Sequence, residues 1–235
     1  MRTAAILPVK RFSRAKQRLG ASVADTLRQR LAQAMVADVM LALAQTESIE
    51  RTIVVTCEGS IAATAREHAA IVLDDATESG QSAAAAIGIR RALADGIERV
   101  LCVPGDCPAL DPSELDALLE AHAYGFAAGD APTPVVIVPD RHGSGTNGLL
   151  LAPPDAIAPA FGADSCERHH RLALTAGLAC RVERPASLLL DVDTGADLAA
   201  LRERLAGHDT RAPRTRAVLG QPDGADALSV STPAC

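Results

Sequence analysis

A dense cluster of cations follows the first apolar run of the chain, residues 4–9. Its members are Lys10, Arg11, Arg14, Lys16 and Arg18, five cations within nine residues. Lys and Arg side chains offset the charge of phosphate groups, so such a cluster could clamp a polyphosphate. A charged loop that is simply solvated has the same composition, and the cluster alone does not decide between the two.

Three acidic residues lie in two other turns that follow apolar runs. Asp106 stands in Val-Pro-Gly-Asp-Cys-Pro after residues 99–103, and Asp191 and Asp193 follow three consecutive leucines. Mg²⁺ prefers one or two carboxylates together with substrate phosphates and waters, so these residues could hold it. The alternative is a turn or helix cap, with Asp106 ahead of a helix near Pro112 and with Thr194 or Asp193 at the start of the last helix.

A glycine-rich segment, residues 139–148, reads Pro-Asp-Arg-His-Gly-Ser-Gly-Thr-Asn-Gly. Glycines let a backbone approach an anion closely, and the amides and hydroxyls around Ser144, Thr146 and Asn147 can donate to that anion. The segment is therefore a candidate for binding substrate. A β-hairpin turn has a similar composition, so the pattern is weak evidence by itself.

The rest of the chain supplies elements that would bring these turns together. Strand-like apolar runs occupy residues 4–9, 51–56, 70–73, 99–103, 135–138 and 149–152, and segments with helical spacing occupy 23–44, 60–68, 82–95, 112–122, 166–176 and 196–205. Continuous apolar strands between helices are typical of a mostly parallel sheet covered on both faces. We therefore predict a three-layer α/β/α, Rossmann-like fold with a mostly parallel mixed sheet. Ligands of such folds bind beyond the carboxyl ends of the strands, where the polar turns would converge.

One domain over residues 1–206 is the economical interpretation of a chain of 235 residues. From residue 207 the alternation of strands and helices ends in a stretch rich in Pro, Gly, Arg, Asp and Ser. This composition predicts a flexible C-terminal tail over residues 207–235, because it offers little apolar surface to bury.

Composition and charge argue against several classes of protein. Aromatic residues make up 2% of the chain and the formal net charge is −6, which disfavours nucleic acid or an anionic membrane as a partner. No apolar run has the length of a membrane span or the form of an export signal, and the cysteines form no Cys-x-x-Cys pair. We expect a cytoplasmic protein with reduced thiols. The absence of a Walker lysine loop and of a Gly-x-Gly-x-x-Gly fingerprint disfavours a P-loop kinase and a dehydrogenase.

Together the polar turns resemble those of a known family. Pro8-Val-Lys10 with Lys16-Gln-Arg-Leu19, Gly105-Asp-Cys-Pro108, residues 139–147 and Asp191-Val-Asp-Thr194 are similar to motifs of the 2-phospho-L-lactate guanylyltransferases, over about residues 3–206. Bacterial members of this family include phosphoenolpyruvate guanylyltransferases, and the family acts in biosynthesis of the deazaflavin coenzyme F-420. The chain is more distantly similar to molybdenum-cofactor nucleotidyltransferases and sugar-nucleotide pyrophosphorylases. This resemblance implies a fold of the nucleotide-diphospho-sugar transferase type.

The resemblance also implies a role for each candidate residue. Lys10, Lys16 and Arg18 would neutralise the triphosphate of GTP, whereas Asp106, Asp193 and Asp191 would hold Mg²⁺. Thr146, Gly162 and Ser165 would receive the phosphate or carboxylate of the acceptor, with Asn147 in the same substrate-binding set. A helix starting after Ser165 would aim its N-terminal amides at that anion. Gly80 and Ser82 stand where the family has Gly-Leu-Asn and would lie near the nucleotide.

The implied reaction transfers GMP from GTP to the phosphate of a three-carbon phosphoacid and releases pyrophosphate. The candidate acceptors are phosphoenolpyruvate, 3-phospho-D-glycerate and 2-phospho-L-lactate. A homodimer, and a hand-off of the product to the next transferase of the pathway, are the candidate associations. Two alternatives stay open at this stage: a CTP- or molybdopterin-type nucleotidyltransferase of the same fold, and a non-catalytic nucleotide-binding regulatory domain.

Overall fold

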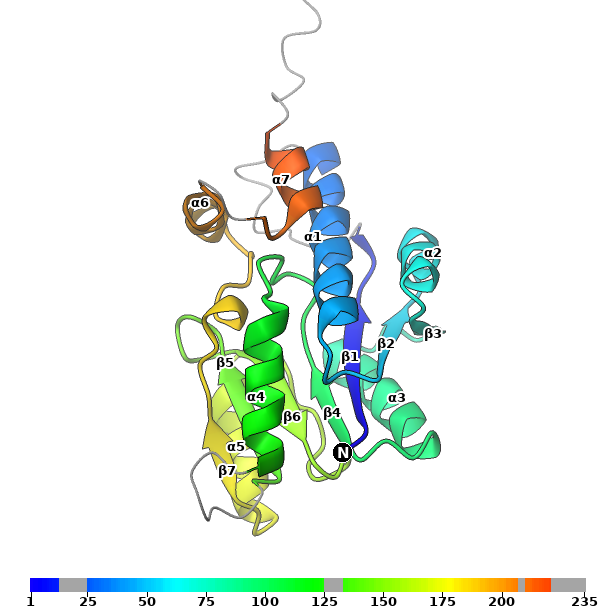
Figure 1. The fold of residues 1–235 in the computed structure, drawn as a ribbon, viewed down its shortest axis with the longest axis vertical. Helices are drawn as coiled ribbons and strands as arrows, with labels where there is room; N and C mark the ends of the chain where they lie inside the picture. The colour runs from blue at the N-terminus through cyan, green and yellow to red at the C-terminus, as the bar shows by residue number, and fades with distance from the viewer. Residues whose placement is uncertain (13–24, 125–132, 207–209, 221–235) are drawn as a thin grey trace, which may run out of the picture.

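The computed structural model of the protein describes residues 1–12, 25–124, 133–206 and 210–220. Within these residues a seven-stranded sheet has the order β3-β2-β1-β4-β6-β5-β7 (Figure 1). The strands are β1 (Thr3–Val9), β2 (Arg51–Thr56), β3 (Ile71–Leu73), β4 (Arg99–Cys102), β5 (Val135–Pro139), β6 (Thr146–Leu151) and β7 (Cys180–Val182). The helices are α1 (Asp25–Gln45), α2 (Gly59–Glu67), α3 (Gln81–Ala94), α4 (Pro112–Tyr124), α5 (Ser165–Thr175), the 3₁₀ turn η3 (Ala186–Leu188), α6 (Gly195–Arg204) and α7 (Pro213–Leu219).

The sheet is parallel except at β6, which runs antiparallel to both of its neighbours, β4 and β5. A short connection joins β5 to β6, and a connection of that length can join only antiparallel strands. Because β6 is reversed, its first residues lie at the same edge of the sheet as the last residues of β1, β4 and β5. The predicted mostly parallel mixed sheet is confirmed, and so is the convergence of the polar turns on one edge.

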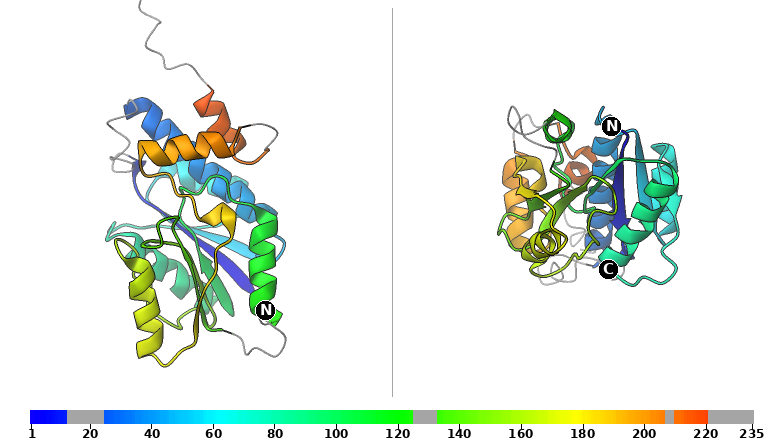
Figure 2. Two further views of the ribbon diagram at one scale, coloured as in Figure 1. Left: turned by 90° about the vertical axis from the view of Figure 1, so that its left-hand side faces the viewer. Right: turned by 90° about the horizontal axis from the view of Figure 1, so that it is seen from below.

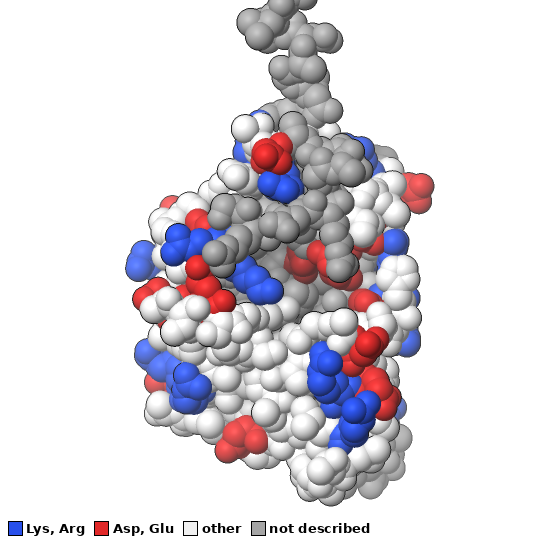
Figure 3. Space-filling view, turned by 180° about the vertical axis from the view of Figure 1, so that it is seen from behind, with Lys and Arg blue, Asp and Glu red and all other residues white. Residues whose placement is uncertain are grey.

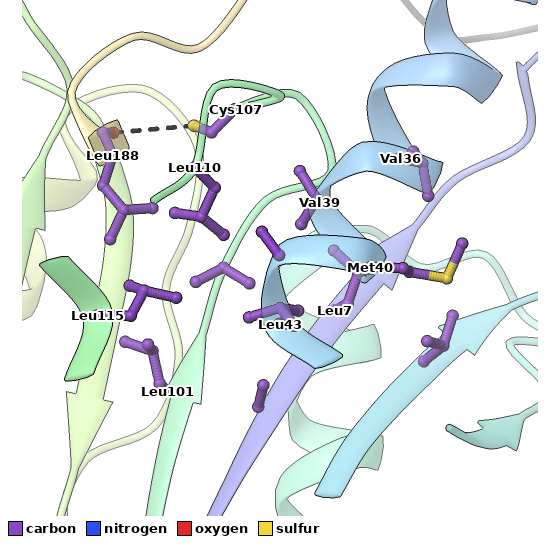
Figure 4. Close-up of a cluster of buried hydrophobic side chains, with 14 of the residues drawn as sticks. Leu7, Val36, Val39, Met40, Leu43, Leu101, Cys107, Leu110, Leu115 and Leu188 are labelled. Atoms are coloured by element: carbon purple, nitrogen blue, oxygen red, sulfur yellow. Dashed lines mark hydrogen bonds between the residues drawn. The ribbon is translucent and has the colours of Figure 1, made fainter. Parts of the chain in front are cut away.

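Helices cover both faces of the sheet (Figure 2), and the side chains of the central strands alternate between two cores, one on each face. In β1, Leu7 and Val9 pack against α1 and α4, whereas Ala4 and Ile6 pack against α3 and α5. Figure 4 shows Leu7 beneath the side chains that α1 directs at the sheet. Gly88 lets α3 approach closely, because a Cβ at this position would lie 2.5 Å from Ile6 Cγ2. The fold is therefore the expected three-layer α/β/α arrangement.

The predicted end of the domain at residue 206 is wrong for residues 213–219, which form α7 on the outer side of α1 (Figure 1). The carboxylate of Asp38, buried in α1, accepts hydrogen bonds from the first-turn amides of α7: Arg214 N at 3.1 Å and Thr215 N at 2.7 Å. These amides have no partner within their own helix, so a carboxylate from α1 caps α7 across the interface. The rest of the predicted flexible tail, residues 207–209 and 221–235, lies outside the described residues.

Acidic and basic side chains are interspersed over the face seen in Figure 3. This distribution agrees with the small net charge of the whole chain, −6. Among the helices that the structure describes, none has the length and apolar character needed to cross a bilayer.

Candidate active site

Two adjoining clefts open at the sheet edge where the polar turns meet. The first, which we call the α1 cleft, lies between the end of β1 and α1 and includes Phe12, Met35 and Val36. The second, the α5 cleft, has a volume of about 540 Å³, within the usual range for small-molecule sites. It is lined by eight of the predicted site residues: Lys10, Asp106, Thr146, Asn147, Gly162, Ser165, Asp191 and Asp193. Both clefts share the side chains of Lys10, Gln81, Asp106 and Asp193, so these residues lie at the junction.

The turn that carries Asp106 is fixed by packing and by a backbone contact. A Cβ at Gly105 would lie 2.8 Å from Val36 Cγ2, so only a residue without a side chain lets the turn pack this tightly on α1. The backbone amide of Val192 donates to the Asp106 carbonyl at 3.0 Å. This bond ties the turn after β4 to the segment that carries Asp191 and Asp193, although the two are far apart in sequence.

Helix capping, the alternative reading of the last acidic segment, is also present, and of the two residues considered for it Thr194 is the N-cap of α6. Thr194 and Asp197 form a capping box at the start of α6, and the Asp197 carboxylate also accepts from the Asp193 amide at 3.2 Å. Arg141 forms an ion pair with Asp197 at 2.5 Å. Burial raises the pKa of Asp197, but the hydrogen bonds from Thr194 and Asp193 and the charge of Arg141 outweigh it and lower the pKa overall. The cap is thus formed by Thr194 and Asp197, and Asp191 and Asp193 line the cleft.

Asp191 is held in a half-buried position by Asn147. The Asn147 amide nitrogen donates to Asp191 Oδ1 at 3.1 Å and to the Leu188 carbonyl at 2.8 Å. The pKa of Asp191 is raised, first by burial and then by the negative charge of Asp106, with a smaller effect of Asp193. The charges of Asp106 and Asp193 thus act on Asp191, which indicates that negative charge is concentrated beside the junction of the two clefts.

This donor set fits a magnesium ion that is completed by substrate. Among the residues that the structure describes, no three His, Cys, Asp or Glu side chains come together closely enough to enclose a metal ion. Mg²⁺ ordinarily takes only one or two carboxylates and keeps waters and substrate phosphates as its other ligands. The negative charges of Asp106 and Asp193 raise the pKa of Asp191, and a divalent cation would offset this repulsion between hard carboxylate oxygens, so the chemistry of the three residues suits the ion.

On the opposite wall of the α5 cleft, Thr146 and Ser165 are both buried. The first two amides of α5 already have protein partners: Ser165 N donates to the Gly162 carbonyl at 3.2 Å, and Cys166 N donates to the Ser144 carbonyl at 3.1 Å. The expectation that these amides point freely at an anion is therefore wrong for the start of the helix. The hydroxyl groups of Thr146 and Ser165 line the cleft and can donate to a ligand.

The loop over residues 160–164 closes the same cleft and is held by side chains from two helices. Arg168 donates from Nε to the Ala160 carbonyl at 3.0 Å and from Nη2 to the Ala163 carbonyl at 2.7 Å. Gly162 has a φ of +117°, which a residue with a side chain would adopt only with strain. The Ser82 hydroxyl accepts from the Phe161 amide at 2.8 Å.

Two of the predicted nucleotide contacts therefore have another local role. Gly80 precedes α3 with a φ of +106°, and neither it nor Ser82 is among the described residues that line the two clefts. Ser82 instead supports the loop over residues 160–164 through Phe161. Its neighbour Gln81, which we did not predict, lines both clefts from the first position of α3.

Of the basic cluster, Lys10 is exposed and lines both clefts. Arg11 makes an ion pair with Glu78 at 2.9 Å, so its charge is partly compensated on the protein itself. Lys16 and Arg18 lie outside the described residues, and their contact with the triphosphate stays a prediction.

Comparison with known proteins agrees with this geometry. The family described as "Guanylyl transferase CofC like" matches residues 3–216. A phosphoenolpyruvate guanylyltransferase of Conexibacter woesei is 48% identical over 94% of this chain and 96% of its own, and one of Sphaerobacter thermophilus is 36% identical over 88% and 94%.

A solved structure from Desulfovibrio desulfuricans G20, assigned as a nucleotide-diphospho-sugar transferase, shares the fold. It covers 93% of this chain and 94% of its own with a TM-score of 0.68, at 18% sequence identity. The predicted type of fold and the predicted enzyme class, a nucleotidyltransferase, are confirmed. The chain belongs to the CofC-like guanylyl transferase family.

Proposed function

We propose that the protein transfers GMP from GTP to the phosphate of phosphoenolpyruvate or a closely related three-carbon phosphoacid, with release of pyrophosphate. The names of the curated relatives support guanylyl transfer and favour phosphoenolpyruvate as the acceptor. One structural observation carries the proposal. Asp106, Asp193 and Lys10 line both the α1 cleft and the α5 cleft, as a reaction between two bound phosphate-bearing substrates requires.

In this reaction an oxygen of the acceptor phosphate attacks the α-phosphorus of GTP. The bond between the α-phosphorus and the bridging oxygen to the β-phosphate breaks, and pyrophosphate leaves with the electron pair. The attacking phosphate is already ionised at neutral pH, so no side chain has to remove a proton. Catalysis then depends on orientation and on compensation of charge.

The residues assigned to the acceptor line only the α5 cleft, and those assigned to GTP are the basic residues that follow β1. Thr146, Gly162 and Ser165, in the α5 cleft, hold the acceptor. Lys10, together with Lys16 and Arg18, compensates the charge of the triphosphate. Asp106 and Asp193, which line both clefts, would ligate Mg²⁺, with the carboxylate of Asp191 beside them, and the ion when bound offsets negative charge that develops on the phosphate oxygens.

The product is a guanylylated phosphoacid, an activated group that suits transfer to a deazaflavin precursor in the biosynthesis of coenzyme F-420. We extend the proposal to this pathway, and to a hand-off of the product to the next transferase and a homodimeric assembly. The guanylylated product contains a phosphoanhydride, so direct hand-off would shorten its exposure to water.

Pyrophosphate release tests the proposal directly. Each of the four nucleoside triphosphates is incubated with the protein, Mg²⁺ and one of the three acids, phosphoenolpyruvate, 3-phospho-D-glycerate or 2-phospho-L-lactate. The acids are then placed in competition and the products are identified by mass spectrometry. We expect GTP and phosphoenolpyruvate to give the dominant product. Turnover with CTP and no turnover with GTP would instead identify a cytidylyltransferase, and binding of nucleotide without turnover would identify a regulatory domain.

A further inference from the structure

A buried histidine of α5 contacts three parts of the acceptor side of the α5 cleft. His169 has no solvent-exposed surface. Its Nδ1 lies 3.0 Å from Thr146 Oγ1, and its Nε2 lies 2.8 Å from the Ala160 amide nitrogen. Its ring also makes an edge contact with Phe161, with ring centroids 5.2 Å apart. His169 therefore joins β6 to the loop over residues 160–164.

These two hydrogen bonds decide which ring nitrogen carries the proton. A backbone amide can only donate, so the Ala160 amide requires that Nε2 of His169 be an acceptor without a hydrogen. The single proton of the neutral ring must then be on Nδ1, where it donates to Thr146 Oγ1. The other tautomer would place two hydrogens face to face between Ala160 and His169.

The environment also keeps the ring neutral. Burial, and then the nearby charge of Arg168, lower the pKa of His169 to about 4. Protonation would add a hydrogen at Nε2 and break the bond from the Ala160 amide. The ring thus presents one donor and one acceptor in a fixed order at neutral pH.

The state of His169 in turn fixes what the Thr146 hydroxyl can do. Because Oγ1 accepts from the imidazole, the hydroxyl hydrogen is not used in that bond. Among the residues that the structure describes, His169 is the only hydrogen-bond partner of this hydroxyl, and Thr146 lines the α5 cleft. A hydroxyl that is held as an acceptor on one side is left to donate on the other.

We propose that His169 is a positioning residue that holds the Thr146 hydroxyl as a hydrogen-bond donor to the anionic group of the acceptor. This inference rests on the proposed function, since it takes the α5 cleft as the acceptor site. The relay runs from the Ala160 amide through the imidazole to the hydroxyl and the ligand. Hydrogen bonds in such a chain polarise one another, which strengthens the last donor.

Two substitutions separate the relay from mere support of the loop. The amide nitrogen of an asparagine can take the place of Nδ1, so His169→Asn keeps a donor to Thr146 and gives up the acceptor for Ala160. The longer glutamine can place its amide oxygen near Nε2, so His169→Gln keeps the acceptor for Ala160 and gives up the donor to Thr146. His170→Gln makes the same change one residue along, at a half-buried histidine that contacts neither partner, and is the matched control.

The KM values for the acceptor and for GTP are measured for each variant. We expect His169→Gln to raise the acceptor KM roughly 10-fold more than His169→Asn does, since a hydrogen bond to a charged ligand is at stake. The KM for GTP should change much less, and His170→Gln should behave as the wild type. The reverse order of the two His169 variants, or an equal rise in both KM values, would overturn the proposal and assign His169 to loop support.

Coupling between the two residues gives a second measurement. In a Thr146→Val background, which removes the hydroxyl and keeps the shape, His169→Gln should cause no further rise in the acceptor KM. A full additional rise would show that His169 acts independently of Thr146 and would contradict the relay.

A third measurement uses the wild-type protein and no substrate. NMR of the protein with ¹⁵N-labelled histidine reports which ring nitrogen of His169 carries the proton. A proton on Nδ1 is expected, and a proton on Nε2 would overturn the proposal. If the wild type does not use GTP and a phosphoacid, the proposed function fails, whereas the tautomer of His169 is still decided by this experiment.

Discussion

The Asn147 side chain holds the Asp191 carboxylate by a hydrogen bond of 3.1 Å between Nδ2 and Oδ1. Asn147 is the second residue of β6, and Asp191 lies on a segment that precedes α6, so a rigid strand positions a carboxylate of a distant segment. The bond favours the charged form of Asp191, against burial and the charge of Asp106. The site therefore keeps a carboxylate in a place where ionisation is unfavourable without a counter-charge.

Asp191→Asn should make the protein more stable at pH 7 in the absence of Mg²⁺. The folded-state pKa of Asp191 is raised above its ordinary value of 3.8. Between pH 3.8 and the folded-state pKa, the folded state therefore binds more protons than the unfolded state. Stability is then lost as the pH rises through the folded pKa, and the neutral amide removes this loss. Thermal unfolding should give a higher Tm for the variant at pH 7 and no difference below pH 3.8.

Added Mg²⁺ should make the Tm of the wild type higher than that of Asp191→Asn, because the ion would stabilise the wild type more than the variant. Asp155→Asn, at an exposed residue outside both clefts, is the control. A lower Tm for Asp191→Asn at pH 7 without divalent ions would contradict the raised pKa.

Asp106→Asn and Asp193→Asn should each reduce turnover by at least ~100-fold while the fold is retained. Both side chains lie at the junction of the two clefts, where a metal ion that they hold would compensate the charge of both substrates. Steady-state rates at saturating Mg²⁺, with circular dichroism to check folding, test this prediction. Near-normal rates for both variants would exclude these residues as ligands.

Thr146→Ala and Ser165→Ala should raise the KM of the acceptor much more than that of GTP. Each removes a hydroxyl from the wall of the α5 cleft, and a hydrogen bond to a charged group is worth ~1.5–3 kcal/mol, or roughly 10- to 150-fold in kcat/KM. Lys16→Ala should show the opposite pattern and raise the KM of GTP more than that of the acceptor. If Thr146→Ala and Ser165→Ala instead lower the affinity for GTP and leave the affinity for the acid unchanged, the two substrate sites are the reverse of our assignment.

A chain that ends at residue 206 should unfold at a lower temperature than the intact protein. The truncation removes α7 and leaves the buried carboxylate of Asp38 without the amides of Arg214 and Thr215. Turnover should fall as well, because α1 also lines the α1 cleft. A chain that ends at Gly220 keeps the described contacts of α7 and is the control.

Asp38→Ala tests the same contact without truncation. Loss of a side chain that caps the first turn of a helix costs about 1–2 kcal/mol, and Asp38→Asn, which keeps one acceptor oxygen, should cost less. Chemical denaturation measures the free energy of unfolding for both. Equal stability of Asp38→Ala and the wild type would show that α7 contributes nothing through this contact.

Much of the fold follows from the alternation of short continuous apolar runs, typical of strands buried on both faces, with longer segments of helical spacing. The reversal of β6 and the strand β7 do not follow in this way. Residues 149–152 look like any other buried strand. The strand in fact begins at Thr146, and its first three residues, Thr146, Asn147 and Gly148, carry no apolar signal, so the short connection that fixes its direction is hidden in the sequence. In β7, Arg181 and Val182 are exposed, so the segment carries no apolar run.

Part of the candidate site could likewise be predicted from the sequence, and part could not. Acidic and hydroxyl residues that follow apolar runs were brought to one edge as expected, because strand ends determine their place. The capping of α7 by Asp38 spans about 176 residues and leaves no local pattern. His169 lies four residues after Ser165, on the same face of α5, and that helical spacing was the signal that could have revealed it.

The reversed strand β6 has a consequence for changing the selectivity of the enzyme. Thr146 and Asn147 begin a strand whose residues 149–151 pair with both β4 and β5, and their side chains bond to His169 and Asp191, so a shift of their backbone would disturb both the sheet and the site. Residues 160–164, by contrast, belong to a loop that side chains of α3 and α5 hold in place. Efforts to redesign this protein for a bulkier acid would therefore do best to vary that loop and its supports and to leave the strand unchanged.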